Sequence, residues 1–236
     1  MKSKIIMVLD TETVGLEGHI YDIGYVITNK RGDTLAEQNW LVEENFTNPK
    51  RMMGAFYAGK HFSHYSRMLQ DQKIRLTPWA EIVATLRADL AEHGVTVIAA
   101  YNAGFDFRVL RQTHADLGGT DAIVQSPVEI LDLWQFACET KLQQKQYANI
   151  ARACGWVSPA GNIKTGAEFA YRYVSGDHSF IEDHTALSDA RIEVAIMAEC
   201  FRQKKSVPYG VINASPWRLV NPTAGEDAHI HGSKVA

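Results

Sequence analysis

Three separate segments of the sequence carry acidic residues in patterns that could bind a divalent metal ion. The first is Asp10-x-Glu12, directly after the apolar run 5–9. Residues two apart on a strand point to the same face, so these carboxylates would lie side by side. Two like charges that close need a positive neighbour, and Mg²⁺ prefers such oxygen ligands. The alternative is a strand end with two solvated acids, because Asp-x-Glu alone is common.

The second acidic segment follows another apolar run, at residues 95–100. Asp106 lies in Tyr101-Asn102-Ala103-Gly104-Phe105-Asp106, where a helix would begin. The carboxyl would sit just beyond the C-terminal end of a central strand, which is where open α/β sheets place their sites. Taken alone, Asp106 could also be an acid that interacts favourably with the dipole at a helix N-terminus.

The third segment combines an acid with a histidine in Asp183-His184-Thr185-Ala186-Leu187-Ser188-Asp189. The spacing of the apolar residues Ala186, Ala190 and Met197 predicts a helix face packed inward, with Asp189 beside it. A buried acid needs a partner, which a metal ion would supply. The five-residue separation turns His184 away from Asp189 on a regular helix. Both can serve one site only if His184 lies at the helix entry or on the preceding loop. Otherwise His184 would be a solvated helix-entry residue.

These segments need a sheet to position them. Residues 5–10, 20–28 and 35–42 read as strands, and the turn chemistry of residues 29–33 predicts an antiparallel hairpin. Residues 95–100 and 128–131 read as further short strands. Thr77 is the expected N-cap and Pro78 the first residue of a helix that runs to residue 94. Further helices are expected at residues 104–117, 133–141, 146–154, 165–174 and 185–203. This order predicts an α/β fold, a mixed β-sheet flanked by α-helices.

Length and composition bound the class of protein. The 236 residues suffice for one domain, predicted at residues 1–205, with residues 206–236 as an extended C-terminal tail. No run of apolar residues approaches membrane length. Three cysteines without metal or redox spacing predict buried, reduced thiols and a cytoplasmic location. The net charge of −3 argues weakly against nucleic-acid binding, but a metal-dependent enzyme needs only a local basic path.

An insertion at residues 50–75 has the opposite charge to the rest of the chain. Six basic residues minus one acidic residue give it a net charge of +5. Aromatic residues Phe56, Tyr57, Phe62 and Tyr65 are interleaved with the basic ones. Cations for phosphates and aromatics for bases suit single-stranded nucleic acid. An amphipathic helix with buried aromatics and solvated charges explains the pattern equally well. Neutralising Lys60 and Arg67 should weaken the salt dependence of binding only in the first case.

Together, the acidic segments resemble the three exonuclease motifs of the DEDDh 3′–5′ exonucleases, a DnaQ-like family with a ribonuclease H-like fold. The family includes the proofreading epsilon-type subunits, RNase T and oligoribonuclease. The resemblance rests on Asp10-x-Glu12, Asn102-x-x-x-Asp106 with Phe105, and His184-x-x-x-x-Asp189-Ala190, with support from Gly15-Leu16, Asp22-Ile23-Gly24 and Leu131-Asp132-Leu133. It spans residues 5–198, and three ordered motifs are far more specific than one. Residues 50–75 and 141–180 depart from the family pattern.

The resemblance implies a catalytic set of Asp10, Glu12, Asp106, His184 and Asp189. Asp10, Glu12, Asp106 and Asp189 would hold two divalent cations, Mg²⁺ or Mn²⁺. Two ions about 3.5–4 Å apart can activate water and stabilise the leaving oxygen of a phosphodiester. His184 would take the proton from the attacking water, because imidazole titrates near neutral pH. The expected reaction releases nucleoside 5′-monophosphates from the 3′ end of single-stranded nucleic acid, with DNA favoured over RNA.

Substrate contacts are also implied by the resemblance. Backbone amides from Thr13 through Gly15 to Leu16 would grip the terminal nucleotide, and the Leu16 side chain would wedge against its base. Asn102 and Phe105 complete the expected set, although Phe105 also reads as a core residue. The alternatives are a 3′–5′ exoribonuclease of the RNase T or oligoribonuclease kind, a proofreading subunit bound to a DNA polymerase, and a nucleic-acid binder without activity. Self-association stays open.

Overall fold

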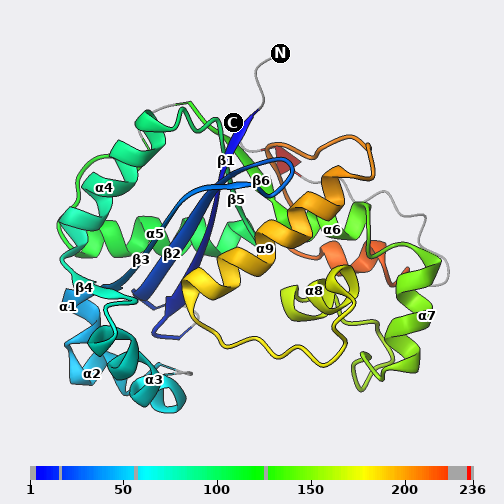
Figure 1. Ribbon diagram of the computed structural model, residues 1–236, viewed down its shortest axis with the longest axis horizontal. Helices are drawn as coiled ribbons and strands as arrows, with labels where there is room; N and C mark the ends of the chain where they lie inside the picture. The colour runs from blue at the N-terminus through cyan, green and yellow to red at the C-terminus, as the bar shows by residue number, and fades with distance from the viewer. Residues whose placement is uncertain (1–3, 16–17, 56–57, 125–126, 223–232, 235–236) are drawn as a thin grey trace.

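The computed structural model of the protein describes residues 4–15, 18–55, 58–124, 127–222 and 233–234. A six-stranded sheet of order β4-β3-β2-β1-β5-β6 forms its centre, with helices on both faces (Figure 1). The strands are β1 (Ile5–Thr13), β2 (Ile20–Asn29), β3 (Thr34–Val42), β4 (Arg75–Thr77), β5 (Val97–Ala100) and β6 (Glu129–Asp132). β2 pairs antiparallel with both β1 and β3, whereas β5 pairs parallel with β1 and β6. The predicted mixed α/β sheet is therefore confirmed.

The two faces of β1 belong to different cores. Ile6 and Val8 pack with the helices on one face, whereas Met7 and Leu9 pack with those on the other. This alternation is the two-residue period of a strand. Asp10 and Glu12 follow at the same two-residue spacing, so the polar end of β1 lies on the same face of the sheet as Ile6 and Val8.

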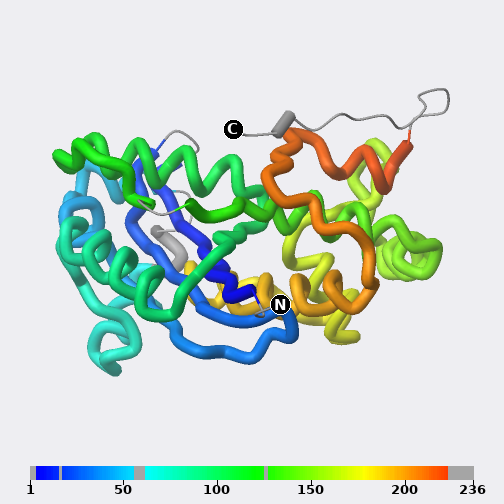
Figure 2. Tube along the Cα trace, turned by 90° about the horizontal axis from the view of Figure 1, so that it is seen from above, coloured from blue at the N-terminus to red at the C-terminus, as the bar shows by residue number. Residues whose placement is uncertain are grey.

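Helices divide between the two faces and the two ends of the sheet. α4 and α5 build the core with Met7 and Leu9, and α6 to α9 build the core with Ile6 and Val8. Figure 2 shows α6, α7 and α8 at the opposite end of the molecule from α1 to α4. The helices are α1 (Glu43–Phe46), α2 (Pro49–Met52), α3 (Ala58–Gln70), α4 (Trp79–Glu92), α5 (Ala103–Asp116), α6 (Leu133–Glu139), α7 (Lys145–Ala153), α8 (Ala167–Ser175) and α9 (Ala186–Phe201).

The start of α4 differs from the prediction. Thr77 is the last residue of β4, where it pairs with Val42, and Pro78 takes the N-cap position. The backbone N–H of Trp79 instead donates to the carboxylate of Glu44 in α1. A side chain from another element thus satisfies the first free N–H of the helix, which local sequence reasoning could not foresee.

Residues 206–222 lie against the body of the protein. The backbone N–H of Gly210 donates to the carbonyl oxygen of Ile130 in β6 at 2.8 Å. Asn213 bonds Gln135 in α6, and Asn221 bonds the backbone of Ile163. The short elements after α9 are β7 (Val211–Ile212) and η1 (Pro216–Leu219) in this segment, and β8 (Ser233–Lys234), which pairs with β7. The division at residue 205 stays a prediction.

Two other expectations meet the structure here. The three cysteines are free thiols; Cys138 and Cys200 are buried as predicted, but Cys154 is exposed, because it lies just beyond the end of α7. Among the residues that the structure describes, no helix is both long enough and apolar enough to cross a membrane.

Candidate active site

Two carboxylates, those of Asp10 and Glu12, lie near the carboxyl-terminal end of β1. Asp10 pairs in register with Gly24 of β2, and Glu12 pairs with Asp22. Both acids follow Ile6 and Val8 on the face covered by α9, as their even spacing requires. The prediction that they share one face is consistent with this register.

α9 brings Asp189 to the same place. Asp189 lies in its first turn and is 6% exposed. The helix can approach because β2 has a glycine beneath it: a Cβ on Gly24 would lie 2.4 Å from the backbone nitrogen of Leu187. Any larger residue would push the start of α9, and Asp189 with it, away from β1.

α5 contributes the fourth carboxylate. Asp106 lies in the first turn of α5 and is 3% exposed. The Thr11 hydroxyl donates to its Oδ1 at 2.7 Å, which ties the start of α5 to β1. The residue before the helix, Asn102, has the left-handed φ of 70°, so the chain turns sharply from β5 into α5.

His184 lies on the loop before α9, at φ 56°, two residues before the helix begins. Its Nδ1 is 3.7 Å from a carboxylate oxygen of Glu182, and the imidazole is partly exposed. Glu12, His184 and Asp189 each offer a ligand atom, and these atoms lie within 4.8 Å of one another. The loop position therefore solves the spacing problem that a regular helix would have posed.

Burial and mutual repulsion raise the pKa values of the clustered acids. Burial, followed by the charges of Glu182 and Glu12, raises the pKa of Asp189 to about 10. Burial, followed by Asp22 and Glu182, raises the pKa of Glu12 to about 9. Burial also raises the pKa of Asp106 to about 7, although the Thr11 hydrogen bond opposes this shift. Such a set holds protons unless positive charge replaces them.

Unpartnered oxygens mark where that charge would sit. Oδ2 of Asp10 and Oδ1 of Asp189 are buried without a hydrogen-bond partner in the described structure. Buried acceptors are almost always paired, so two on facing elements indicate a missing ligand. Carboxylate oxygens suit a hard divalent cation. The donor set therefore fits the expected Mg²⁺ or Mn²⁺.

Two further acids belong to the cluster and were missed in the sequence. Glu193 is 2% exposed, and its carboxylate accepts from the backbone N–H of Tyr101 at 3.2 Å. Burial, together with Asp106 and Asp189, raises its pKa well above the ordinary value. Its position four residues after Asp189 on the inward face of α9 was the available signal. Glu182, beside His184, lay in a loop without a pattern.

The residues expected to contact substrate differ in where the structure places them. Thr13 donates its hydroxyl to the carbonyl oxygen of Gly15, which has φ 74° and open space where a side chain would begin. Leu16 lies outside the described residues. Asn102 is exposed next to the site, whereas Phe105 packs toward the core of α4 and α5. The contacts of Phe105 favour its core reading.

Of the aromatic residues in the 50–75 segment, one is buried, as expected for an amphipathic helix, and another is exposed, as expected for nucleic-acid binding. Tyr65 is fully buried and packs with Tyr21, Leu41 and Met52. Phe62 is 53% exposed and stacks on Phe46, with 5.8 Å between the ring centroids. Phe56 and Tyr57 lie outside the described residues. The role of the segment therefore stays a prediction.

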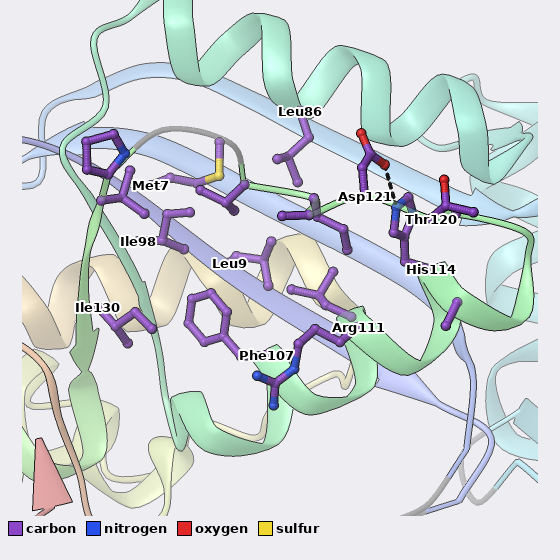
Figure 3. A pocket seen from close by; sticks show the side chains of 18 residues that line it. Met7, Leu9, Leu86, Ile98, Phe107, Arg111, His114, Thr120, Asp121 and Ile130 are labelled. Atoms are coloured by element: carbon purple, nitrogen blue, oxygen red, sulfur yellow. Dashed lines mark hydrogen bonds and ion pairs between the residues drawn. The ribbon is translucent and has the colours of Figure 1, made fainter. Parts of the chain in front are cut away.

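A separate apolar cavity of about 580 Å³ lies on the other face of the sheet, between α4, α5 and the loop that follows α5 (Figure 3). Met7, Leu9 and Ile98 form its floor. His114, one of its polar residues, bonds both Trp79 and Asp121. None of the expected catalytic residues is among the described residues that line this cavity.

Comparison with known proteins places the fold. No protein-family model and no curated protein sequence matches the chain. Among solved structures, it is similar to E. coli Exonuclease I with a bound oligonucleotide, at 14% identity and a TM-score of 0.53 over 86% of this chain and 41% of that one. It is also similar to Exonuclease I from Methylocaldum szegediense, at 15% identity and a TM-score of 0.50 over 86% of this chain and 41% of that one. Exonuclease X in complex with a 5′ overhanging duplex DNA matches over 86% of this chain and 95% of that one, at 20% identity and a TM-score of 0.47.

The two Exonuclease I structures show the fold. The chain has the same ribonuclease H-like fold, a mixed sheet flanked by helices, as the resemblance of its motifs implies. It spans about two fifths of the Exonuclease I chains that it matches.

Proposed function

We propose that the protein is a metal-dependent 3′–5′ exonuclease that hydrolyses single-stranded nucleic acid, DNA in preference to RNA, and releases nucleoside 5′-monophosphates. The observation that carries the proposal is the cluster of Asp10, Glu12, Asp106 and Asp189, drawn from three elements to the end of β1. Two of these acids have buried oxygens without a partner in the described structure. The exonuclease fold supports the same reaction class.

The residues divide the work by position. Asp10, Glu12 and Asp189, with Asp106 nearby, would hold two divalent cations. When bound, such cations lower the pKa of water and neutralise charge on the phosphate. His184 stands on a loop beside Glu12 and Asp189, where its imidazole can take a proton from the attacking water. The turn from Thr13 to Leu16, together with Asn102, would hold the terminal nucleotide.

The test uses 5′-labelled DNA and RNA oligonucleotides of one sequence, each with Mg²⁺, Mn²⁺ or EDTA. We expect a ladder that shortens from the 3′ end only with metal, and faster with DNA. Asp189→Ala serves as the inactive control. Faster cleavage of RNA would instead support the exoribonuclease alternative. Metal-independent binding without any cleavage would support an inactive binder, and the proposed reaction would be wrong.

Partners and location stay proposals. Truncation at residue 205 would test whether residues 1–205 carry the activity alone, as the predicted division requires. We expect a loss of stability there, because Gly210 and Asn213 bond β6 and α6. A cytoplasmic location is proposed from the free thiols alone.

A further inference from the structure

Asp22 joins three elements at the edge of the carboxylate cluster. It lies on β2 opposite Glu12 and is fully buried. Its Oδ2 accepts the Tyr65 hydroxyl of α3 at 2.7 Å and the backbone N–H of Ala186 in α9 at 3.1 Å. One carboxylate oxygen thus connects the sheet, the helix of the basic insertion, and the helix that carries Asp189.

The bond to Ala186 fixes the start of α9. A helix leaves its first N–H groups unsatisfied, and here the N-cap Thr185 makes no side-chain capping bond. Asp22 takes that role from a strand 164 positions away in sequence. An acid also interacts favourably with the positive end of the helix. Because Ala186 stands between His184 and Asp189, this bond constrains both.

Contact with β2 constrains the same segment in another direction. Gly24, two residues after Asp22, lies directly under Leu187, where a Cβ would be 2.4 Å from the backbone nitrogen. The hydrogen bond to Asp22 and the close approach at Gly24 together define where α9 begins.

The insertion helix reaches the outer side of the same segment. Arg67, two residues after Tyr65, helps to line a hollow of about 590 Å³ with Asp183, Thr185 and Ser188. Nucleic acid that contacts α3 would therefore lie beside the His184 loop. Tyr65 is the buried link beneath that surface, since its ring packs inside while its hydroxyl bonds Asp22.

We propose that Asp22 is a positioning residue that holds His184 and Asp189 against Glu12, and that Tyr65 couples the insertion helix α3 to this arrangement. The coupling rests on the proposed nuclease function; the positioning itself does not. Loss of either bond lets the start of α9 shift relative to β1, while every proposed metal ligand stays in the chain.

The decisive variant is Tyr65→Phe, matched with Tyr25→Phe. Tyr25 lies on β2 and, like Tyr65, is a buried tyrosine whose hydroxyl donates to an aspartate, here Asp89 at 2.6 Å, but on the face of the sheet away from α9. We expect Tyr65→Phe to lower kcat about tenfold or more with KM little changed, because a supporting partner of a metal site typically contributes this much. Tyr25→Phe should keep the wild-type kcat. Equal effects of the two variants, or none in Tyr65→Phe, would overturn the proposal.

Two readouts do not depend on cleavage. The amide proton signal of Ala186 should move in Tyr65→Phe but not in Tyr25→Phe, and Mn²⁺ affinity should fall about tenfold in the first variant only. If wild-type protein cleaves nothing, the proposed function fails while these signals still decide the positioning role. An unmoved Ala186 signal with unchanged Mn²⁺ affinity would overturn that role.

Substitution of Asp22 separates geometry from charge. Asp22→Asn keeps an oxygen that can accept both hydrogen bonds, whereas Asp22→Ala leaves the Ala186 N–H and the Tyr65 hydroxyl without this acceptor. We expect Asp22→Asn to retain most of the Mn²⁺ affinity that Asp22→Ala loses. Equal losses in two folded variants would mean that the charge matters and would overturn positioning through hydrogen bonds.

Discussion

The two faces of the sheet treat buried polar groups in opposite ways. On the α4 and α5 face, His114 bonds Trp79 on one side and Asp121 on the other. On the α9 face, Asp10 and Asp189 each keep a buried oxygen without a partner in the described structure. The histidine therefore has its hydrogen-bond partners, whereas burying the two unpartnered carboxylate oxygens costs free energy unless a cation is bound.

This difference in hydrogen bonding distinguishes the apolar cavity on the α4 and α5 face from the candidate active site on the α9 face. The cavity on the α4 and α5 face is lined mainly by apolar residues, and its His114 is already hydrogen-bonded to Trp79 and Asp121. The α9 face has the unfavourable electrostatics that folding alone would not select. Perturbed pKa values grouped in one place are typical of functional sites.

The largest expected effect comes from removing a carboxylate on the α9 face. Asp189→Ala should lower the cleavage rate by about a thousandfold or more, since metal ions supply several kcal/mol of transition-state stabilisation. Thermal unfolding in EDTA should show no loss of stability, because an unsatisfied buried acid is removed. Glu199→Gln, at the far end of α9, is the control. Measurable cleavage at the wild-type rate would exclude Asp189 from the site.

His184→Ala should have the next largest effect. The rate should fall about 10²–10⁴-fold, the usual contribution of a general base. Mn²⁺ affinity should change little, and the pH–rate profile should lose the limb that the imidazole controls. An unchanged profile would count against His184 as the base. A collapse of Mn²⁺ affinity would instead make it a ligand with Glu12 and Asp189, which the structure also permits.

The pH dependence of stability should differ between the metal-free and the metal-bound protein. Folding raises the pKa values of Asp189 and Glu12 to about 10 and about 9. Unfolded carboxyls titrate near pH 4, so the stability from these groups is fully present below that pH and is lost as the pH rises toward 9–10. Denaturation in EDTA should show this loss, and Asp189→Asn should reduce it. Mn²⁺ should stabilise the protein more at pH 8 than at pH 6; the reverse trend would contradict the assigned pKa shifts.

The smallest effect on activity is expected on the other face. Trp79→Phe removes the donor to His114, which should cost about 1–3 kcal/mol of unfolding free energy because a buried acceptor loses its partner. The cleavage rate should stay at the wild-type value. Chemical denaturation and the oligonucleotide assay measure the two quantities. A strong loss of activity in the folded variant would show that the two faces are not independent.

Sequence patterns predicted the local parts of this arrangement well. Alternation along β1 was enough to place Asp10 and Glu12 on one face, and apolar spacing located α9 and its inward side. The contacts between distant elements could not be predicted this way. The Asp22 bond to Ala186, the Glu44 carboxylate at the start of α4 and the Glu193 bond to Tyr101 all join elements through the tertiary fold. Glu193 was not recognised as a site residue because the sequence does not show which other acids lie next to it in the fold.

Direct titration of the metal-free protein with Mn²⁺ by calorimetry tests the central claim, that the α9 face holds divalent cations. We expect saturable binding of two ions, release of protons that grows with falling pH across the range where the protein is folded, and loss of at least one ion in Asp189→Ala. No saturable binding, or identical binding by the variant, would contradict the account.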